Sequence, residues 1–175
     1  KENLPGIYTA TGSLGQGLSV GIGMALGKRL LNDNHIVYVL ISDGELQEGQ
    51  TWEAIAFAAH YKLDNLVVTV DWNNKQIDDN VDEIMSLGDI YTKLKAAGWQ
   101  VLLLENGNDL KAIHHTLKNA KNLLFSKKPI VILMKTIMGK GVDFMENDYR
   151  WHGTPPNDDE YARALVQLPA TMLDF

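Results

Sequence analysis

The sequence predicts an α/β protein: a parallel sheet with helices on both faces. Short apolar runs rich in Val, Ile and Leu alternate along the chain with longer segments of helical character. Such continuous apolar runs are typical of strands that are buried on both faces. Polar and Gly-containing loops follow the runs, and parallel strands need crossovers of about a dozen residues or more, usually helices. Together these features favour a parallel sheet over an antiparallel one.

The expected elements follow one another in a regular order. Residues 1–11 form an irregular lead-in, and a Gly-rich loop then opens a helix that ends near Leu31. Strands are expected at residues 36–41, 66–70, 99–104 and 130–135. Further helices are expected at residues 49–61, 88–97, 109–125 and 158–166, with a loop or short helical turn at 78–87. Gly98 suits the position after a helix end, and Asn108 or Asp109 suits a helix N-cap.

One domain is expected to fill nearly the whole chain. Residues 1–166 form the α/β domain, and residues 167–175, which include Pro169, form a C-terminal tail or linker. The first residue is not Met and the chain opens in a loop, so we expect a domain that is incomplete at its N-terminus. A chain of 175 residues is long enough to bury a real core.

Composition narrows the class of function. The chain is 45% hydrophobic and 22% charged, like ordinary globular proteins. Its net charge of −6 argues against a nucleic-acid partner. The absence of cysteine excludes a disulfide framework and a thiolate zinc site, and it favours a cytoplasmic location. No apolar run approaches the roughly eighteen residues that span a bilayer, so no membrane association is expected.

Polar side chains follow the first two expected strands. Ser42-Asp43 follows residues 36–41, and Asn73 lies three residues beyond residues 66–70. Open parallel sheets bind ligands at the carboxyl ends of their strands, so both side chains are expected to face one crevice. Carboxylate and amide oxygens suit Mg²⁺ or Ca²⁺ better than zinc. Taken alone, an Asp-Gly pair usually indicates an ordinary tight turn.

Two other features have both a structural and a functional interpretation. The glycines from Gly12 to Gly17 either permit close packing or let a ligand approach the backbone. No clear strand precedes them, so the Rossmann fingerprint is not met. His152 lies in a loop with Gly and Pro, which favours a functional role more than the helical positions of His60, His114 and His115 do.

Taken together, the loops resemble those of the thiamine diphosphate enzymes, and among these the transketolases. Asp43-Gly44 with Asn73 matches the metal motif of that superfamily, with Ser42 in place of its first Gly. The stretches that match transketolase, in its order, are Thr11–Leu18, Asp43–Gly49, Lys135-Thr136 with Gly139–Gly141, and Trp151–Gly153. The likeness covers nearly the whole chain, and it is greatest to the N-terminal subunit of a split, two-polypeptide transketolase.

The resemblance implies a role for each matching residue. Asp43 and Asn73 would bind Mg²⁺ through their side chains and Lys75 through its carbonyl, with Ca²⁺ as a possible substitute. The residues that would contact thiamine diphosphate are Gly12, Leu14, Gly44, Glu45, Ile77 and His152. His152 would also face the substrate channel and act as the catalytic residue of this chain.

The resemblance further implies transfer of a two-carbon ketol unit from a ketose phosphate to an aldose phosphate, as in pentose phosphate metabolism. Other catalytic residues of the family lie outside this chain, including a Glu in a pyrimidine-binding domain. We therefore expect a C-terminal subunit or domain as partner, a homo- or hetero-oligomer, and no activity from the isolated chain. The alternatives are a 1-deoxyxylulose-5-phosphate synthase, a pyruvate dehydrogenase E1 component, and a non-catalytic assembly module with the same fold.

Overall fold

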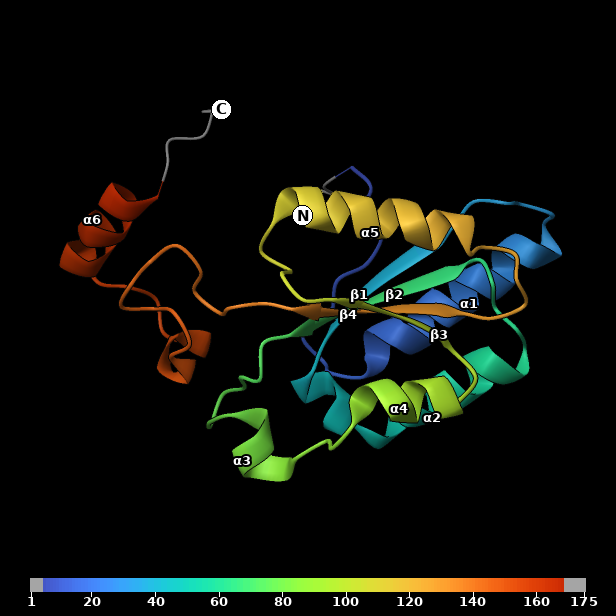
Figure 1. Cartoon of the computed structure of the whole chain (residues 1–175), viewed down its shortest axis with the longest axis horizontal. Helices are drawn as coiled ribbons and strands as arrows, with labels where there is room; N and C mark the ends of the chain where they lie inside the picture. Colours follow the sequence, from blue (N-terminus) through green and yellow to red (C-terminus); the bar gives the residue numbers. More distant parts are fainter. Residues whose placement is uncertain (1–4, 169–175) are drawn as a thin grey trace.

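The computed structural model describes residues 5–168 and contains a four-stranded parallel sheet (Figure 1). Its strands are β1 (Val37–Ser42), β2 (Leu66–Trp72), β3 (Gln100–Leu104) and β4 (Ile130–Lys135). The order across the sheet is β1-β2-β4-β3, and every neighbouring pair is parallel. The predicted α/β fold is confirmed, and each predicted strand lies within two residues of the observed one.

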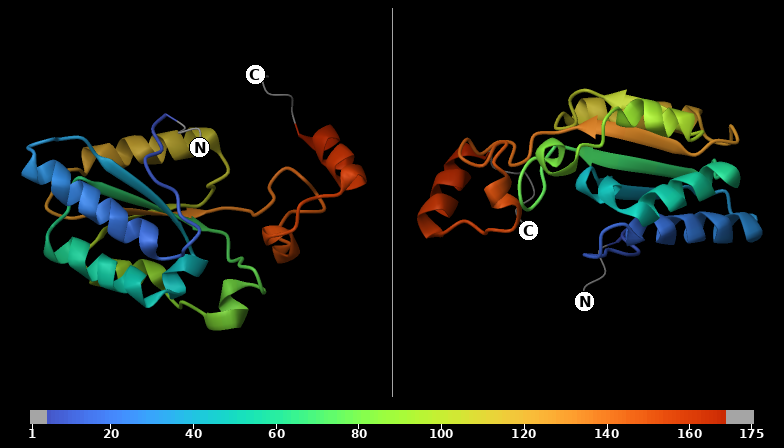
Figure 2. Two further views of the ribbon diagram at one scale, coloured as in Figure 1. Left: turned by 180° about the vertical axis from the view of Figure 1, so that it is seen from behind. Right: turned by 90° about the horizontal axis from the view of Figure 1, so that it is seen from below.

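Helices cover both faces of this sheet (Figure 2). One face carries α1 (Gln16–Leu30), α2 (Gly49–His60) and α4 (Ile90–Ala96), and the other carries α5 (Leu110–Asn122). The shorter elements are α3 (Val81–Met85), α6 (Asp158–Gln167) and the 3₁₀ turns η1 (Gly44–Gln47) and η2 (Tyr149–His152). No helix within residues 5–168 is long and apolar enough to cross a bilayer.

Two helix boundaries differ from the predicted ones, and a short helical turn is confirmed. The helix α1 begins at Gln16 because Gly15, with φ of +82°, turns the chain just before it. Asn122 ends α5 three residues early, and Phe125 then adopts a positive φ of 58°. Residues 78–87 contain the short helix α3. The predicted tail, residues 167–175, falls largely outside the described residues.

The core consists of two apolar layers, one on each side of the sheet. Between the sheet and α1, α2 and α4 lie fully buried side chains such as Leu18, Leu66 and Leu133. A smaller layer under α5 contains Val67 and Ile130. These two layers hold the carboxyl ends of the strands in register, and those ends carry the polar loops described below.

One half of the α5 face of the sheet is left open in residues 5–168. Tyr38 and Leu40 of β1 point to this side and are 49% and 69% exposed. A cavity of about 390 Å³ runs between them and α5, lined by apolar groups that include Leu117 and Met134. Parallel sheets are normally covered on both faces. This half of the sheet is therefore an apolar surface of the described chain.

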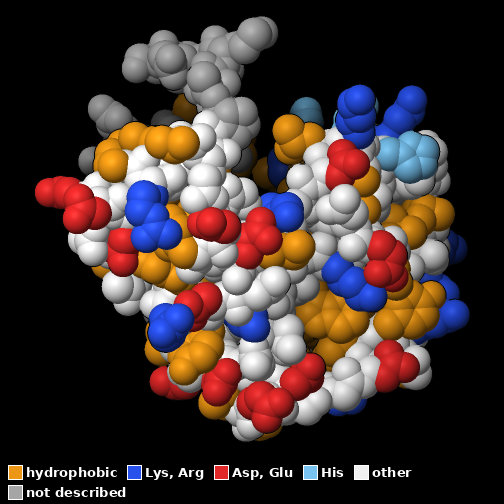
Figure 3. Space-filling model, turned by 60° about the vertical axis from the view of Figure 1, so that its left-hand side comes forward, with side chains coloured by type: hydrophobic (Ala, Val, Ile, Leu, Met, Phe, Trp, Pro, Cys, Tyr) orange, Lys and Arg blue, Asp and Glu red, His pale blue; other side chains and the backbone are white. Residues whose placement is uncertain are grey.

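Beyond the carboxyl end of β4 the chain forms a small lobe that contains η2 and α6 (Figure 1). Asn157 caps α6 with a reciprocal capping box, because its side chain accepts the Glu160 N–H while the Glu160 carboxylate accepts the Asn157 N–H. Within the lobe, the indole N–H of Trp151 donates to the carbonyl of Phe144 at 2.9 Å. Figure 3 shows this side of the molecule, where acidic and basic side chains are interspersed.

Candidate functional site

The carboxylate of Asp43 joins the carboxyl ends of β1 and β2. One oxygen accepts the N–H of Gly44 at 2.8 Å, and the other accepts the N–H of Asn74, beyond β2, at 2.5 Å. The N–H of Asp43 in turn donates to the carbonyl of Asp71 at 3.2 Å. The side chain is almost fully buried, with 1% of its surface exposed. The predicted convergence of the two strand ends is therefore present in the structure.

Burial raises the pKa of the Asp43 carboxyl to about 6. The N–H groups of Asn74 and Gly44 oppose this rise, and the nearby Asp71 carboxylate adds to it. Desolvation disfavours the charged form of a carboxyl, so keeping this group ionised near neutral pH costs free energy. A cation beside the carboxylate would offset that cost, and the group therefore fits a metal ligand.

The turn after β2 is built by its own side chains. The side-chain oxygen of Asn73 accepts the N–H of Lys75 at 2.8 Å. Asn74 adopts a left-handed conformation with φ of +58°, and its side-chain oxygen accepts the N–H of Asp82 at 3.1 Å. Lys75 forms a short antiparallel bridge with Asn80. These contacts fix the turn against α3, so the Asn73 amide and the Lys75 carbonyl have defined positions on either side of Asn74, whose N–H reaches Asp43.

The donor set of this edge is made of oxygen atoms. No group of three or more His, Cys, Asp or Glu side chains lies together within residues 5–168. A carboxylate offers about four lone-pair sites, and Asp43 uses two of them for backbone N–H groups. Carboxylate, amide and carbonyl oxygens with such free capacity suit Mg²⁺ or Ca²⁺.

The Gly-rich loop at residues 11–17 lies against η1 and α2. The N–H of Gly15 donates to the Glu45 carboxylate at 2.8 Å, and the side chain of Gln50 donates to the carbonyl of Leu14 at 3.0 Å. Leu14 is 52% exposed, and a Cβ on Gly12 would meet no atom within 4 Å. The loop thus presents open backbone and one apolar side chain near Asp43-Gly44.

Three predicted site residues lie at the edge of this arrangement. Gly44 opens η1, where a Cβ would make only an ordinary 3.6 Å contact with Gln76. Ile77 is 69% exposed on the turn that follows β2. His152 is exposed on η2, and within residues 5–168 its side chain makes no hydrogen bond or ion pair.

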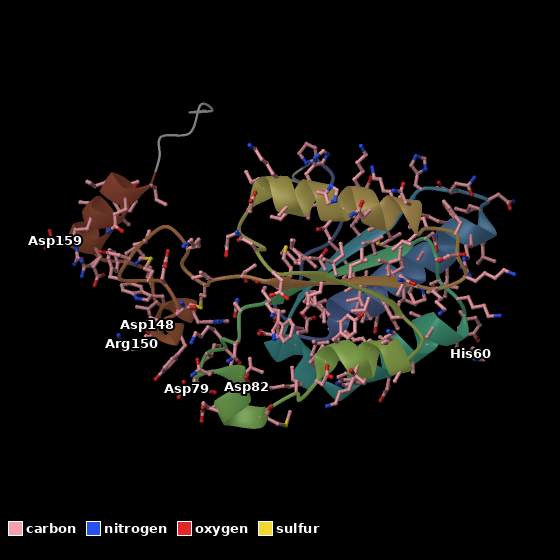
Figure 4. All side chains as sticks on the ribbon, in the orientation of Figure 1. His60, Asp79, Asp82, Asp148, Arg150 and Asp159 are labelled. Atoms are coloured by element: carbon pink, nitrogen blue, oxygen red, sulfur yellow. The ribbon has the colours of Figure 1, made fainter. Side chains whose placement is uncertain are left out.

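The lobe that carries His152 approaches the turn after β2. The Arg150 guanidinium holds the pKa of Asp148 below its usual range, and Lys75 contributes to the same effect. Figure 4 shows Asp148 and Arg150 on the same side of the molecule as Asp79 and Asp82, which lie before and within α3. His152 therefore belongs to a segment beside the proposed metal ligands, although it does not contact them.

The end of β4 contributes a further set of contacts that the sequence did not indicate. The hydroxyl of Thr136 donates to the Asp71 carboxylate, and the N–H of Thr136 donates to the carbonyl of Trp72 at 3.2 Å. Asn108 accepts the N–H of Ile137 at 2.7 Å. These bonds connect three strand ends at one edge of the sheet, and the sequence marked Thr136 only as part of a matching stretch, without indicating its partners.

The family follows from comparison with known proteins. A family model described as the transketolase thiamine diphosphate binding domain matches residues 1–170. The chain belongs to the transketolase family. It is 40% identical over 165 residues to an apulose-4-phosphate transketolase subunit of Phocaeicola vulgatus, covering 94% of this chain and 58% of the relative. It is also 37% identical over 163 residues to a 6-deoxy-6-sulfo-D-fructose transketolase subunit of Clostridium sp., covering 93% and 58%.

The solved structures agree with this assignment. The transketolase of Campylobacter jejuni superimposes with a TM-score of 0.82 at 34% identity, over 93% of this chain and 26% of that one. A Pichia stipitis transketolase bound to sedoheptulose-7-phosphate gives a TM-score of 0.83 at 28% identity, over 93% of this chain and 25% of that one. The predicted resemblance to transketolase is thus confirmed at the level of the family. This transketolase domain spans a little over half the length of the two subunits named above.

Proposed function

We propose that this domain binds the metal and the diphosphate end of thiamine diphosphate in a split transketolase. The assembled enzyme transfers a two-carbon ketol unit from a ketose phosphate to an aldose phosphate. The observation that carries the proposal is the Asp43 carboxylate, buried at the joined ends of β1 and β2 with a raised pKa. In a family whose matching domain is described as binding thiamine diphosphate, that group is the natural ligand for the accompanying cation.

Three groups hold Mg²⁺ in this proposal: the side chains of Asp43 and Asn73 and the carbonyl of Lys75. Their convergence at one strand edge supports it, because Asp43 accepts the N–H of the residue between the other two. The Asn73 side chain braces the same turn through the Lys75 N–H. Ca²⁺, which also prefers oxygen ligands, is the expected substitute.

Four further residues contact the cofactor in this proposal. Gly12 and Gly44 allow close approach to the backbone, whereas Leu14 and Ile77 offer exposed apolar side chains to its rings. Glu45, expected from the resemblance to contact the cofactor as well, is buried next to Gly44 and its carboxylate binds the N–H of Gly15, so in this proposal it supports the site from behind the loop. Thiamine diphosphate supplies an electron sink for cleaving a carbon–carbon bond next to a carbonyl.

His152 is the catalytic residue of this chain in the proposal. Its exposed imidazole, in a lobe beside the turn after β2, can exchange a proton with a substrate hydroxyl or hold a phosphate. The remaining machinery lies on a pyrimidine-binding partner, whose glutamate activates the cofactor. The active form is therefore a cytoplasmic oligomer of both polypeptides, and the isolated chain is inactive.

The names of the two relatives support the split arrangement, because both are called subunits of a transketolase. One is named for apulose-4-phosphate and the other for 6-deoxy-6-sulfo-D-fructose. Because one name gives a sugar phosphate and the other a sulfonated sugar, the names do not select one substrate, and the proposal remains sugar phosphates, including those of the pentose phosphate type.

Calorimetry on the full subunit mixed with its partner tests the proposal. Thiamine diphosphate should bind when Mg²⁺ is present and lose most of its affinity in EDTA, because the cation bridges the protein and the diphosphate. Equal affinity in EDTA would contradict the metal assignment. A non-catalytic assembly module, the alternative from a different class, would bind no thiamine diphosphate under either condition.

A further inference from the structure

The Gly-rich loop at residues 11–17 is held by two side chains from outside it. Glu45 of η1 accepts the N–H of Gly15 at 2.8 Å. Gln50 of α2 donates to the carbonyl of Leu14 at 3.0 Å and accepts from the side chain of Gln16 at 2.7 Å. These three bonds bridge 30 to 36 residues of sequence. They connect the loop to the segment that begins with Asp43.

Glu45 is itself fixed in place. Its side chain is 8% exposed, and its second carboxylate oxygen faces the N–H of Ser42 at 3.4 Å. Its own N–H donates to the Ser42 hydroxyl at 3.1 Å, and its carbonyl accepts the Thr51 hydroxyl at 3.0 Å. Glu45 accepts the N–H of the buried Gly15, and leaving a buried N–H without a partner is costly. The loop conformation and the Glu45 rotamer are therefore coupled.

Gln50 leaves no room for a side chain at Gly15. Gly15 has a φ of +82°, and a Cβ there would lie 2.6 Å from the Nε2 atom of Gln50. The glycine thus allows both the left-handed backbone and the close approach of the amide. The side chain of Gln50 covers the loop at the point where the Glu45 carboxylate anchors it.

We propose that Glu45 and Gln50 are positioning residues, which hold the loop at 11–17 in the conformation that receives the diphosphate cofactor. They act through Leu14 and Gly15, and Glu45 does so without touching the cofactor, because its carboxylate is committed to backbone N–H groups. This inference rests on the proposed function, in which Gly12 and Leu14 contact thiamine diphosphate. Preorganisation of a loop raises affinity by removing the cost of ordering it on binding.

The test uses the full subunit with its partner and two measurements. Glu45→Ala should weaken the Kd for thiamine diphosphate with Mg²⁺ at least tenfold, while kcat at saturating cofactor stays near the wild-type value. Without cofactor, the same variant should speed amide hydrogen exchange in residues 11–17. Glu45→Gln, which keeps an oxygen for the Gly15 N–H, should recover most of the affinity. Gln50→Ala should weaken the Kd severalfold.

Trp99→Phe is the matched control. It removes another buried hydrogen bond, from the indole N–H to the carbonyl of Ile55 at 3.0 Å, far along the chain from the loop. This variant should lose stability without a change in the Kd or in loop exchange, which separates positioning from a general loss of stability.

Three results would overturn the inference. The first is a Glu45→Ala variant with wild-type affinity for thiamine diphosphate and wild-type amide exchange in residues 11–17. The second is a Trp99→Phe variant that loses as much affinity as Glu45→Ala. The third is a Glu45→Gln variant that loses as much affinity as Glu45→Ala, which would indicate a direct charge contact with the cofactor. If the wild-type complex binds no thiamine diphosphate, the proposed function fails. The hydrogen exchange comparison needs no cofactor and decides the loop contacts on its own.

Discussion

Asn74 lies between two proposed metal ligands, Asn73 and Lys75, in a left-handed conformation with φ of +58°. Its N–H reaches the Asp43 carboxylate at 2.5 Å, and its side-chain oxygen accepts the N–H of Asp82 at 3.1 Å. Asn tolerates this backbone region better than most residues because its short polar side chain can bond locally. The position of the whole turn therefore depends on Asn74, which is not itself a proposed metal ligand.

Substitution of Asn74 separates the contribution of its left-handed backbone from that of its side-chain hydrogen bond to Asp82. Asn74→Ala keeps an L side chain in the left-handed region and loses the bond to Asp82, so the free energy of unfolding should fall by about 1 to 2 kcal/mol. Asn74→Gly loses the same bond but relieves the backbone cost, so its loss should be smaller. Chemical denaturation of the two variants measures the difference. Equal losses would mean that the positive φ contributes nothing.

The residues of the site divide by how far their contacts reach along the chain. The meeting of the β1 and β2 ends could be predicted because Asp43 and Asn73 each lie just beyond an apolar run, and parallel strands place their carboxyl ends together. The bonds from Gly15 to Glu45 and from Thr136 to Asp71 span 30 and 65 residues. No local pattern marks such pairs, since a polar residue in a loop looks the same whether its partner is water or a distant backbone group.

At the scale of elements, α1 shows how glycines with the same helix propensity differ in role. A Cβ on Gly21 would lie 2.3 Å from a methyl carbon of Val39, so this residue lets α1 pack closely on β1. A Cβ on Gly23, two positions later, would meet no atom within 4 Å. The first glycine is required by packing within the described chain, whereas the second is not.

This contrast predicts opposite effects of the same change. Gly23→Ala should raise the free energy of unfolding of the domain by about 0.5 to 1 kcal/mol, because alanine favours the helix. Gly21→Ala receives the same gain, but overpacking typically costs about 1 to 3 kcal/mol, so the net effect should be destabilising. Thermal or chemical unfolding of both variants tests this. Two stabilised variants would show that α1 does not pack closely on β1.

The elements themselves were predictable where the signal is local. All four strands come from compact apolar runs, and the N-cap of α5 at Asp109 accepts two backbone N–H groups as expected. The order β1-β2-β4-β3 could not be predicted in the same way, because β4 pairs with both β2 and β3 through contacts between distant segments. The turns η1 and η2 were also missed, since 3₁₀ turns are short and carry little periodicity.

At the scale of the whole molecule, the described chain leaves an apolar half of its sheet open at Tyr38 and Leu40. The proposed cofactor groups lie at a different place, the carboxyl edge of the strands. The proposed chemistry also needs groups from a second polypeptide. In this proposal the domain can therefore fold without forming a complete active site, which requires binding of the second polypeptide.

Activity should follow assembly. Without its partner, the protein should show no ketol transfer from a ketose phosphate, even with saturating thiamine diphosphate and Mg²⁺, because the proposal places the activating glutamate on the partner. Mixing with the partner should restore transfer in proportion to the complex formed. A coupled assay of the aldose product, run across a titration of the partner, measures this. Full activity in the absence of the partner would contradict the claim that the active site needs groups from both polypeptides.

The central claim is that Asp43 holds the cation on which thiamine diphosphate binding depends. The most direct measurement is a calorimetric titration of thiamine diphosphate, at saturating Mg²⁺, into complexes carrying Asp43→Asn or the matched control Asp78→Asn. The control removes the same charge from an exposed position just after the turn. The account predicts an affinity at least about a hundredfold weaker for Asp43→Asn, since loss of a supporting residue alone can cost about 10- to 100-fold, and an unchanged affinity for the control. Equal affinities in the two complexes would contradict it.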